Sequence, residues 1–190
     1  MSEPRTSAEQ QADTTSARVL EVLAAYEAGR IAAPDVPDLA AVALYAGKVL
    51  SSRLADIELS TRLDSPPLGI VPGPDHLERL SEAVQTVLEE PEDASERLER
   101  LAQSEVLTSY AKSLSAGIRE RGYRWRENVA DDACEVCQPF RNVEHEPDEA
   151  WSPHHPRCRC EPDPYGDPVT ETKPEPTTRV RRVQIQKVTT

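Results

Sequence analysis

The sequence has few of the residues from which a large hydrophobic core is built. Only 4% of its 190 residues are aromatic and 37% are hydrophobic, and no apolar run is long enough to span a bilayer. The first residues, MSEPRTSAEQQADTT, have no apolar stretch after their single arginine, so we expect no secretory signal. These shortages favour small helical units in a soluble protein made in a cytosol, with no membrane partner.

Positive charge and glycine are also scarce. The formal net charge is -12, which argues against a surface that binds nucleic acid throughout, because phosphate binding needs a positive field. The 17 prolines against 7 glycines separate long stretches rich in Ala, Leu, Glu and Arg, which favour helix. The sequence therefore predicts a mainly α fold: a helical N-terminal region, a small zinc-stapled α+β module and an extended tail.

Proline, glycine and changes of periodicity divide the chain into segments. Residues 161–178 are rich in proline and should lack regular structure, whereas 179–187 alternate basic and apolar residues as a strand that orders against a partner would. The expected segments are a disordered arm (1–14), a helical pair (15–63), a Pro-rich linker (64–74), a second helical pair (75–122), a zinc-binding module (123–160) and an extended tail with a possible terminal strand (161–190).

Four helices are expected before the cysteines. The first runs from about residue 16 to a Gly29 cap, and the second over 36–62, with Asp35 as N-cap and Pro37 in its first turn. The third starts at residue 74 or 75 and ends at Pro91, and the fourth spans about 94–121 and stops at Gly122. The second helix is expected to pack through one apolar stripe, formed by Leu39, Val42, Ala43, Ala46, Val49, Leu50, Leu54 and Ile57. A short exposed strand over 123–129 should then lead into the cysteines.

All four cysteines fall in the last third of the chain, which without a secretory signal indicates a metal rather than disulfides. Cys134-x-x-Cys137 places two thiolates at a separation that suits one tetrahedral Zn²⁺, and a second cluster follows with His155, Cys158 and Cys160. His155 with Cys158 repeats the i, i+3 spacing of the first pair. We therefore assign the metal to Cys134, Cys137, His155 and Cys158, with Cys160 as the alternative to Cys158.

Two further histidines compete for the same metal. His145 lies in a Glu/Pro-rich loop and is expected to face solvent, and His154 is expected to be a neighbour of the site rather than a ligand. Four protein ligands leave no open position for water, so the predicted zinc is structural and the protein is not an enzyme. We identify no catalytic residues and no binding site for an organic cofactor or small-molecule substrate.

The run LAQSEVLTSYAKSLSAGIRERGYRWRENVADDACEVC, followed by HHPRCRC, resembles the phage Mu F-like family of minor head (head morphogenesis) proteins, in the form found in actinobacteriophages. In that family a helix with an Arg-Thr-Glu-like motif leads through a short strand into CxxC and then into HPxCRC. The Cys cluster and His155-Pro156 match closely, whereas Gln103-Ser104-Glu105 departs from the helix motif at two positions.

The resemblance implies a low-copy minor capsid protein that acts in head assembly and in packaging or ejection of the genome. Its partners would be the portal, the major capsid protein or both, with possible non-specific contact with packaged DNA. Its location would be the virion, inside the capsid near the portal, and the host cytoplasm during assembly.

Two alternatives come from other classes. A nuclease of the His-Asn-His type also combines CxxC with a histidine, but it needs a catalytic histidine beside its structural zinc, and here zinc binding would use His155. A zinc-dependent DNA-binding regulator is suggested by basic residues around the strand and in the tail, which are Arg119, Arg121, Arg124, Arg126, Arg179, Arg181, Arg182 and Lys187. The negative net charge and the lack of a recognition helix after the cysteines argue against it.

Overall fold

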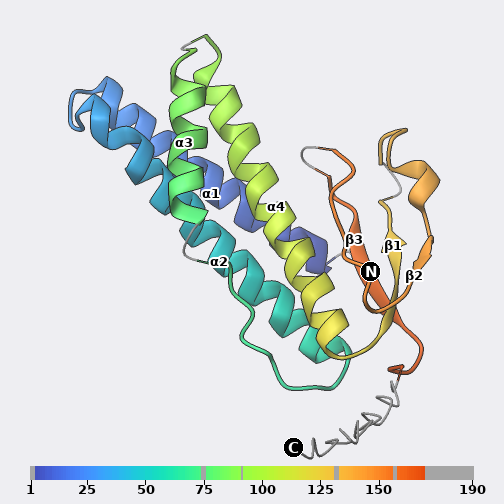
Figure 1. Ribbon diagram of the computed structural model, residues 1–190. Helices are drawn as coiled ribbons and strands as arrows, with labels where there is room; N and C mark the ends of the chain where they lie inside the picture. Colours follow the sequence, from blue (N-terminus) through green and yellow to red (C-terminus); the bar gives the residue numbers. More distant parts are fainter. Residues whose placement is uncertain (1–2, 74–75, 91, 131–132, 156–157, 170–190) are drawn as a thin grey trace, which may run out of the picture.

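The computed structural model describes residues 3–73, 76–90, 92–130, 133–155 and 158–169 (Figure 1). Within these ranges the helices are α1 (Glu3–Glu27), α2 (Val36–Arg62), α3 (His76–Leu88) and α4 (Ala94–Glu120). The strands are β1 (Arg124–Asn128), β2 (Glu144–His145) and β3 (Glu161–Tyr165), with short 3-10 turns at η1 (Ala33–Asp35) and η2 (Gln138–Phe140). The expected mainly α fold with a small α+β module is confirmed.

The helices form an elongated bundle, and the small sheet lies beside the C-terminal half of α4 (Figure 1). Helices α1, α2 and α4 pack against one another, and α3 packs mainly on α2. None of the described helices has the length and apolarity that a membrane span requires. The C-terminal end of α4 leads directly into β1, so this helix positions the segment that carries the cysteines.

Glycine ends two of the helices as the sequence predicts. Gly29 and Gly122 have φ of 70° and 71°, a left-handed conformation that disfavours residues with a Cβ. Beyond each glycine, a backbone N–H bonds to a carbonyl five residues back, from Arg30 to Ala25 and from Tyr123 to Ile118, as in a Schellman cap. At the start of α2, Pro37 lies in the first turn as predicted, whereas the side chain of Asp35 makes no capping hydrogen bond.

The expectation of a disordered arm over residues 1–14 is wrong for the described residues, because α1 begins at Glu3. The helix packs on α4 and α2 through small side chains, and Ala8 and Ala12 are each 2% exposed. Further along α1 the approach to α2 is close: a Cβ on Gly47 of α2 would lie only 2.3 Å from the Thr15 hydroxyl oxygen. Small residues give little hydrophobic periodicity, so the pattern of the sequence did not reveal this interface.

The stripe assigned to the buried side of α2 is also wrong in part. Leu39, Val42, Leu50 and Ile57 are 41% to 57% exposed. The side of α2 that faces the bundle is instead rich in small and polar residues, namely Ala40, Ala41, Gly47, Lys48, Ser51, Ser52, Ala55, Asp56 and Ser60. Small side chains let α2 approach α4 closely, and the buried hydroxyls find partners there, as Ser51 does on the carbonyl of Val106.

The sheet has the order β2-β1-β3 and is antiparallel throughout. The predicted strand is present as β1, but its inner face is buried, with Trp125 2% exposed opposite His145 and Pro164. The expectation that 161–178 lacks regular structure is wrong for residues 161–165, since β3 pairs with β1 along its length. The linker has neither helix nor strand over residues 65–73, as predicted, and the possible terminal strand at 179–187 lies outside the described residues.

Candidate metal centre

Three of the four cysteines lie in the hydrophobic core where the loops of the sheet module meet α4. Cys137, Cys158 and Cys160 are 1%, 4% and 3% exposed, whereas Cys134 is exposed. The same core contains Tyr110 and Leu114 of α4, Trp125 of β1 and Trp151. None of the four cysteines forms a disulfide. Three buried thiols and a neighbouring imidazole thus form groups that could hold a metal ion.

The first pair of predicted ligands is held by a tight turn. The amides of Cys137 and Gln138 both donate to the carbonyl oxygen of Cys134, at 3.0 and 3.2 Å. The turn continues into η2, where the Phe140 amide donates to the Cys137 carbonyl at 3.0 Å. This local geometry directs both thiols of the CxxC sequence to one point, because residues i and i+3 lie on the same side of such a turn.

A second segment presents the other possible ligands. The amide of Cys158 donates to the carbonyl oxygen of His155 at 3.2 Å, so these two residues are held close together. The imidazole of His155 reaches the CxxC turn, where its Nε2 lies 3.2 Å from Sγ of Cys134 and 3.1 Å from Sγ of Cys137. The two segments, about twenty residues apart in the sequence, therefore meet at these three side chains.

Three of the distances among the predicted ligands are within a few tenths of an ångström of those in a tetrahedral site, whereas Cys158 lies outside the group in which the ligand atoms of Cys134, Cys137 and His155 are all within 4.8 Å of one another. Thiolates about 2.3 Å from a zinc ion at tetrahedral angles are about 3.8 Å apart, and a thiolate and an imidazole nitrogen are about 3.5 Å apart. The Cys137 and Cys158 sulfurs are 3.8 Å apart. The sulfur to nitrogen distances at His155 are slightly shorter than the zinc value. The residues present therefore fit the group that their spacing predicts.

Five side chains offer ligand atoms for the four positions of one zinc. They form two overlapping groups, Cys134 with Cys137 and His155, and Cys137 with Cys158 and Cys160, and within each group all ligand atoms lie within 4.8 Å of one another. Cys137 belongs to both groups and is therefore the centre of the cluster. The alternative between Cys158 and Cys160 stays open, because both thiols are close to Cys137.

The electrostatics of the cluster favour a cation. Burial raises the pKa of the Cys137 thiol to about 11, and the hydrogen bond that Cys160 donates to Cys158 lowers the pKa of Cys158 to about 4 and raises that of Cys160. A buried core without a counter-charge disfavours several negative sulfurs side by side. A divalent metal would remove this penalty by deprotonating the thiols that bind it.

Behind the ligands, a polar network supports the loop that carries His155. Glu127 of β1 is 3% exposed and accepts a hydrogen bond from Nε1 of Trp151 at 3.3 Å. The His154 ring lies 3.5 Å from the same carboxylate and stacks on Phe140 at 3.9 Å between ring centroids. Among the described residues, His154 belongs to neither group of possible ligands and lies beside the Cys137 turn through its contact with Phe140. Glu127 was not among the residues predicted from the sequence. It stands two residues after Trp125 on β1, so the alternation of a strand places both side chains on the same buried face, and this was the signal that could have identified it.

The expectation that His145 faces solvent is wrong. It stands in β2, its side chain is 21% exposed, and its ring stacks on Trp125 with centroids 3.9 Å apart. Nδ1 of His145 also interacts with the Glu149 carboxylate at 2.8 Å. Cross-strand pairing with Trp125 brings this histidine onto the sheet. The Glu/Pro-rich sequence around His145 does not predict a strand, so the pairing was not expected.

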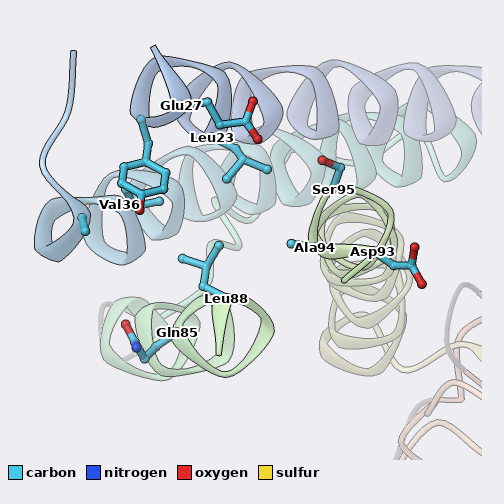
Figure 2. A pocket seen from close by; sticks show the side chains of 10 residues that line it. Leu23, Glu27, Val36, Gln85, Leu88, Asp93, Ala94 and Ser95 are labelled. Carbon is cyan, nitrogen blue, oxygen red and sulfur yellow. The ribbon is translucent and has the colours of Figure 1, made fainter. Parts of the chain in front are cut away.

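A separate cavity of about 450 Å³ lies at the far end of the helical bundle, away from the cysteines (Figure 2). Leu23 of α1 and Leu88 of α3 point toward each other across it. Glu27 and Asp93 also line it, and no cysteine or histidine does. This cavity is therefore separate from the candidate metal centre.

No family model, curated protein or solved structure matches this chain. The geometry of the Cys/His cluster and the pattern of the sequence are therefore the basis for any functional assignment.

Proposed function

We propose that the Cys/His cluster binds one structural zinc ion that joins the two loops of the sheet module and fixes them to α4. The observation that carries this proposal is the position of Cys137, whose sulfur is 3.1 Å from Nε2 of His155 and 3.8 Å from the sulfur of Cys158. Donors of the types that zinc prefers, from two segments about twenty residues apart in the sequence, thereby meet at Cys137.

The ligand set that we propose is Cys134, Cys137, His155 and Cys158, with Cys160 as the alternative to Cys158. A backbone hydrogen bond from Cys158 to His155 corresponds to the one from Cys137 to Cys134, which favours Cys158. Chelator competition on the Cys158→Ser and Cys160→Ser variants tests this choice. We expect a large loss of zinc affinity for Cys158→Ser and a smaller loss for Cys160→Ser, and the reverse order would assign the fourth position to Cys160.

A closed site of this kind supports a structural rather than a hydrolytic role. Four protein ligands leave no coordination position for a water molecule or a substrate. A nuclease of the His-Asn-His type would need a histidine beside its structural zinc, and the two nearby candidates have other partners: His154 stacks on Phe140, and His145 stacks on Trp125. Plasmid incubation with Mg²⁺ or Mn²⁺ checks this inference, and we expect no nicking above that of a His154→Ala, His145→Ala control.

At the level of the whole protein, we propose a low-copy minor head protein of a phage, related to the Mu F-like head morphogenesis proteins. The sequence from the α4 helix through β1 and CxxC to HPRCRC supports this, because the resemblance covers the segments that build the metal centre. The exposed aliphatic residues along α2 also suit a protein that docks on a larger assembly. The proposed partners are the portal or the major capsid protein, with non-specific contact with packaged DNA, and the proposed location is inside the head near the portal.

Proteomics of purified, nuclease-treated phage heads, combined with protease protection, tests this assignment. We expect the protein in heads together with the portal, and protected from external protease until the capsid is opened. Absence from heads at every stage of assembly would refute the virion role. Presence only on the protease-accessible outside would refute the internal position.

A further inference from the structure

A second polar site lies in the helical bundle, apart from the cysteines. A cavity of about 370 Å³ opens where α2, α3 and α4 meet the linker that follows α2. This volume lies in the range of small-molecule sites. Its described lining combines three cationic residues, one carboxylate, several hydroxyls and a short apolar wall: Lys48, Ser52, Ile70, Val71, Pro72, His76, Arg79, Glu105, Thr108, Ser109, Lys112 and Ser113.

The cavity carries an excess of positive charge in a protein of net charge -12. Glu105 is the one carboxylate in its lining, and it already binds two cations. Arg79 donates to both of its oxygens, at 2.9 and 2.7 Å, and Lys48 contacts one of them. Lys112, which is exposed, also lines the cavity. Three cations therefore face one anion, before any charge on His76 is counted.

Lys48 is the buried element of this site. Its side chain is 6% exposed, although an ammonium group at the surface normally stays in water. Burial lowers its pKa, and the positive charges of Arg79 and Lys112 lower it further, so the three cations are close enough to repel one another. An ammonium has three N–H donors, of which the contact with Glu105 uses one. A second anion would therefore stabilise this cluster of three cations and one carboxylate more than it would stabilise a pair whose charges already balance.

The rest of the lining provides what a bound oxyanion needs. Thr108 and Ser113 contribute hydroxyls to the lining, whereas Ser52 and Ser109 are hydrogen-bonded to each other at 2.9 Å and Ser109 donates to the Lys48 carbonyl at 3.3 Å. Ile70, Val71 and Pro72 of the linker give the lining an apolar part, which the Tyr45 hydroxyl holds by a hydrogen bond to the Pro72 carbonyl. Cations and hydroxyls beside an apolar wall suit a small organic molecule with an anionic head.

We propose that this cavity binds a small phosphate monoester, with its phosphate toward Lys48, Arg79 and Lys112 and its organic part against the Ile70–Pro72 wall. A phosphate group fits this set better than a lone carboxylate does, because it presents three oxygens to three separate cations and the hydroxyls beside them. The site is independent of the zinc centre, since the cavity contains none of the Cys/His ligands.

The test is a thermal unfolding titration of the metal-loaded full chain at constant ionic strength, with phenyl phosphate as probe. Inorganic phosphate and phenol are the two halves of the probe and serve as comparisons. We expect phenyl phosphate to raise the unfolding temperature in a saturable way, inorganic phosphate to do so more weakly, and phenol to have no effect, because only a ligand that prefers the folded state stabilises it.

The matched variants are Lys112→Gln in the cavity and Arg119→Gln on the exposed side of the same helix. Both remove one positive charge from an exposed position and should fold. We expect Lys112→Gln to weaken phenyl phosphate binding about tenfold and Arg119→Gln by less than about twofold, since a charge-assisted hydrogen bond contributes about that factor. No stabilisation of the wild type at 10 mM phenyl phosphate, or equal effects of the two substitutions, would overturn the proposal. Equal stabilisation by phenol would overturn it too.

Discussion

Replacing Glu105 by glutamine tests the charge arrangement of the helical bundle. The substitution keeps the size of the side chain but removes the carboxylate that Lys48 and Arg79 share. Lys48, with a side chain 6% exposed, would be left as a buried cation without an anion. Loss of one partner of a buried ion pair costs about 3–5 kcal/mol, so we expect the free energy of unfolding to fall by about 3 kcal/mol, because Glu105 itself is partly accessible.

The contribution of Arg79 should be much smaller. Its side chain is 50% exposed and can turn into water, and Lys48 keeps its contact with Glu105 when Arg79 is removed. Arg79→Gln should therefore cost about 1 kcal/mol or less. The double variant Lys48→Met, Glu105→Leu removes both buried charges, and we expect it to recover most of the stability that Glu105→Gln loses.

Urea unfolding at pH 7 measures these differences, with equal slopes confirming that the variants unfold in the same way. Hydrogen bonds from Arg79 and Lys48 outweigh burial and hold the pKa of Glu105 at about 2, below its ordinary value of 4.5. Its stabilisation is thus fully present above about pH 4.5 and is lost as the pH falls toward 2. A loss below about 1 kcal/mol for Glu105→Gln, or an equal loss for Arg79→Gln, would refute the reasoning.

Three further predictions concern packing in the bundle. Gly47→Ala should destabilise the protein by about 1–2 kcal/mol despite the better helix propensity of alanine, because the new Cβ would lie 2.3 Å from the Thr15 hydroxyl oxygen. Adding Thr15→Ala should recover part of the lost stability. A Gly47→Ala variant with unchanged stability would show that α1 does not pack there. Asp56→Ala should cost about 2–3 kcal/mol and speed proteolysis within 64–73, because its carboxylate accepts two linker amides at 3.0 and 2.7 Å; unchanged cleavage would count against this role. Deletion of residues 1–14 should lower the unfolding temperature clearly, whereas a dispensable arm would leave it unchanged.

Proline and glycine made most of the helical layout predictable. Pro37 and the caps at Gly29 and Gly122 set boundaries by local backbone chemistry, which does not depend on the rest of the fold. The spacing of the predicted ligands was equally informative, because a backbone hydrogen bond across an i, i+3 separation joins Cys137 to Cys134 and Cys158 to His155.

The errors arose where tertiary packing decides which side of an element is buried. On α2, the buried Ser52 and the exposed Val42 reverse the usual preference, because close approach to α4 favours small side chains and hydroxyls that bond across the interface. The N-terminal half of α1 is held in the same way through Ala8 and by the ion pair of Glu9 with Arg159 at 3.3 Å. These contacts join segments about 150 residues apart, which local sequence patterns do not reveal.

Elemental analysis of the purified protein tests the central claim most directly. If the converging segments form a closed zinc site, the wild-type chain should contain about one zinc, and the Cys134→Ser, Cys137→Ser double variant should contain none. The same variant should lose the ordered packing of 123–160 while its helices remain folded, because the helical bundle has its own core around Leu44, Leu80 and Leu98. Zinc at full stoichiometry in the double variant, or a wild-type chain that binds no zinc, would contradict the account.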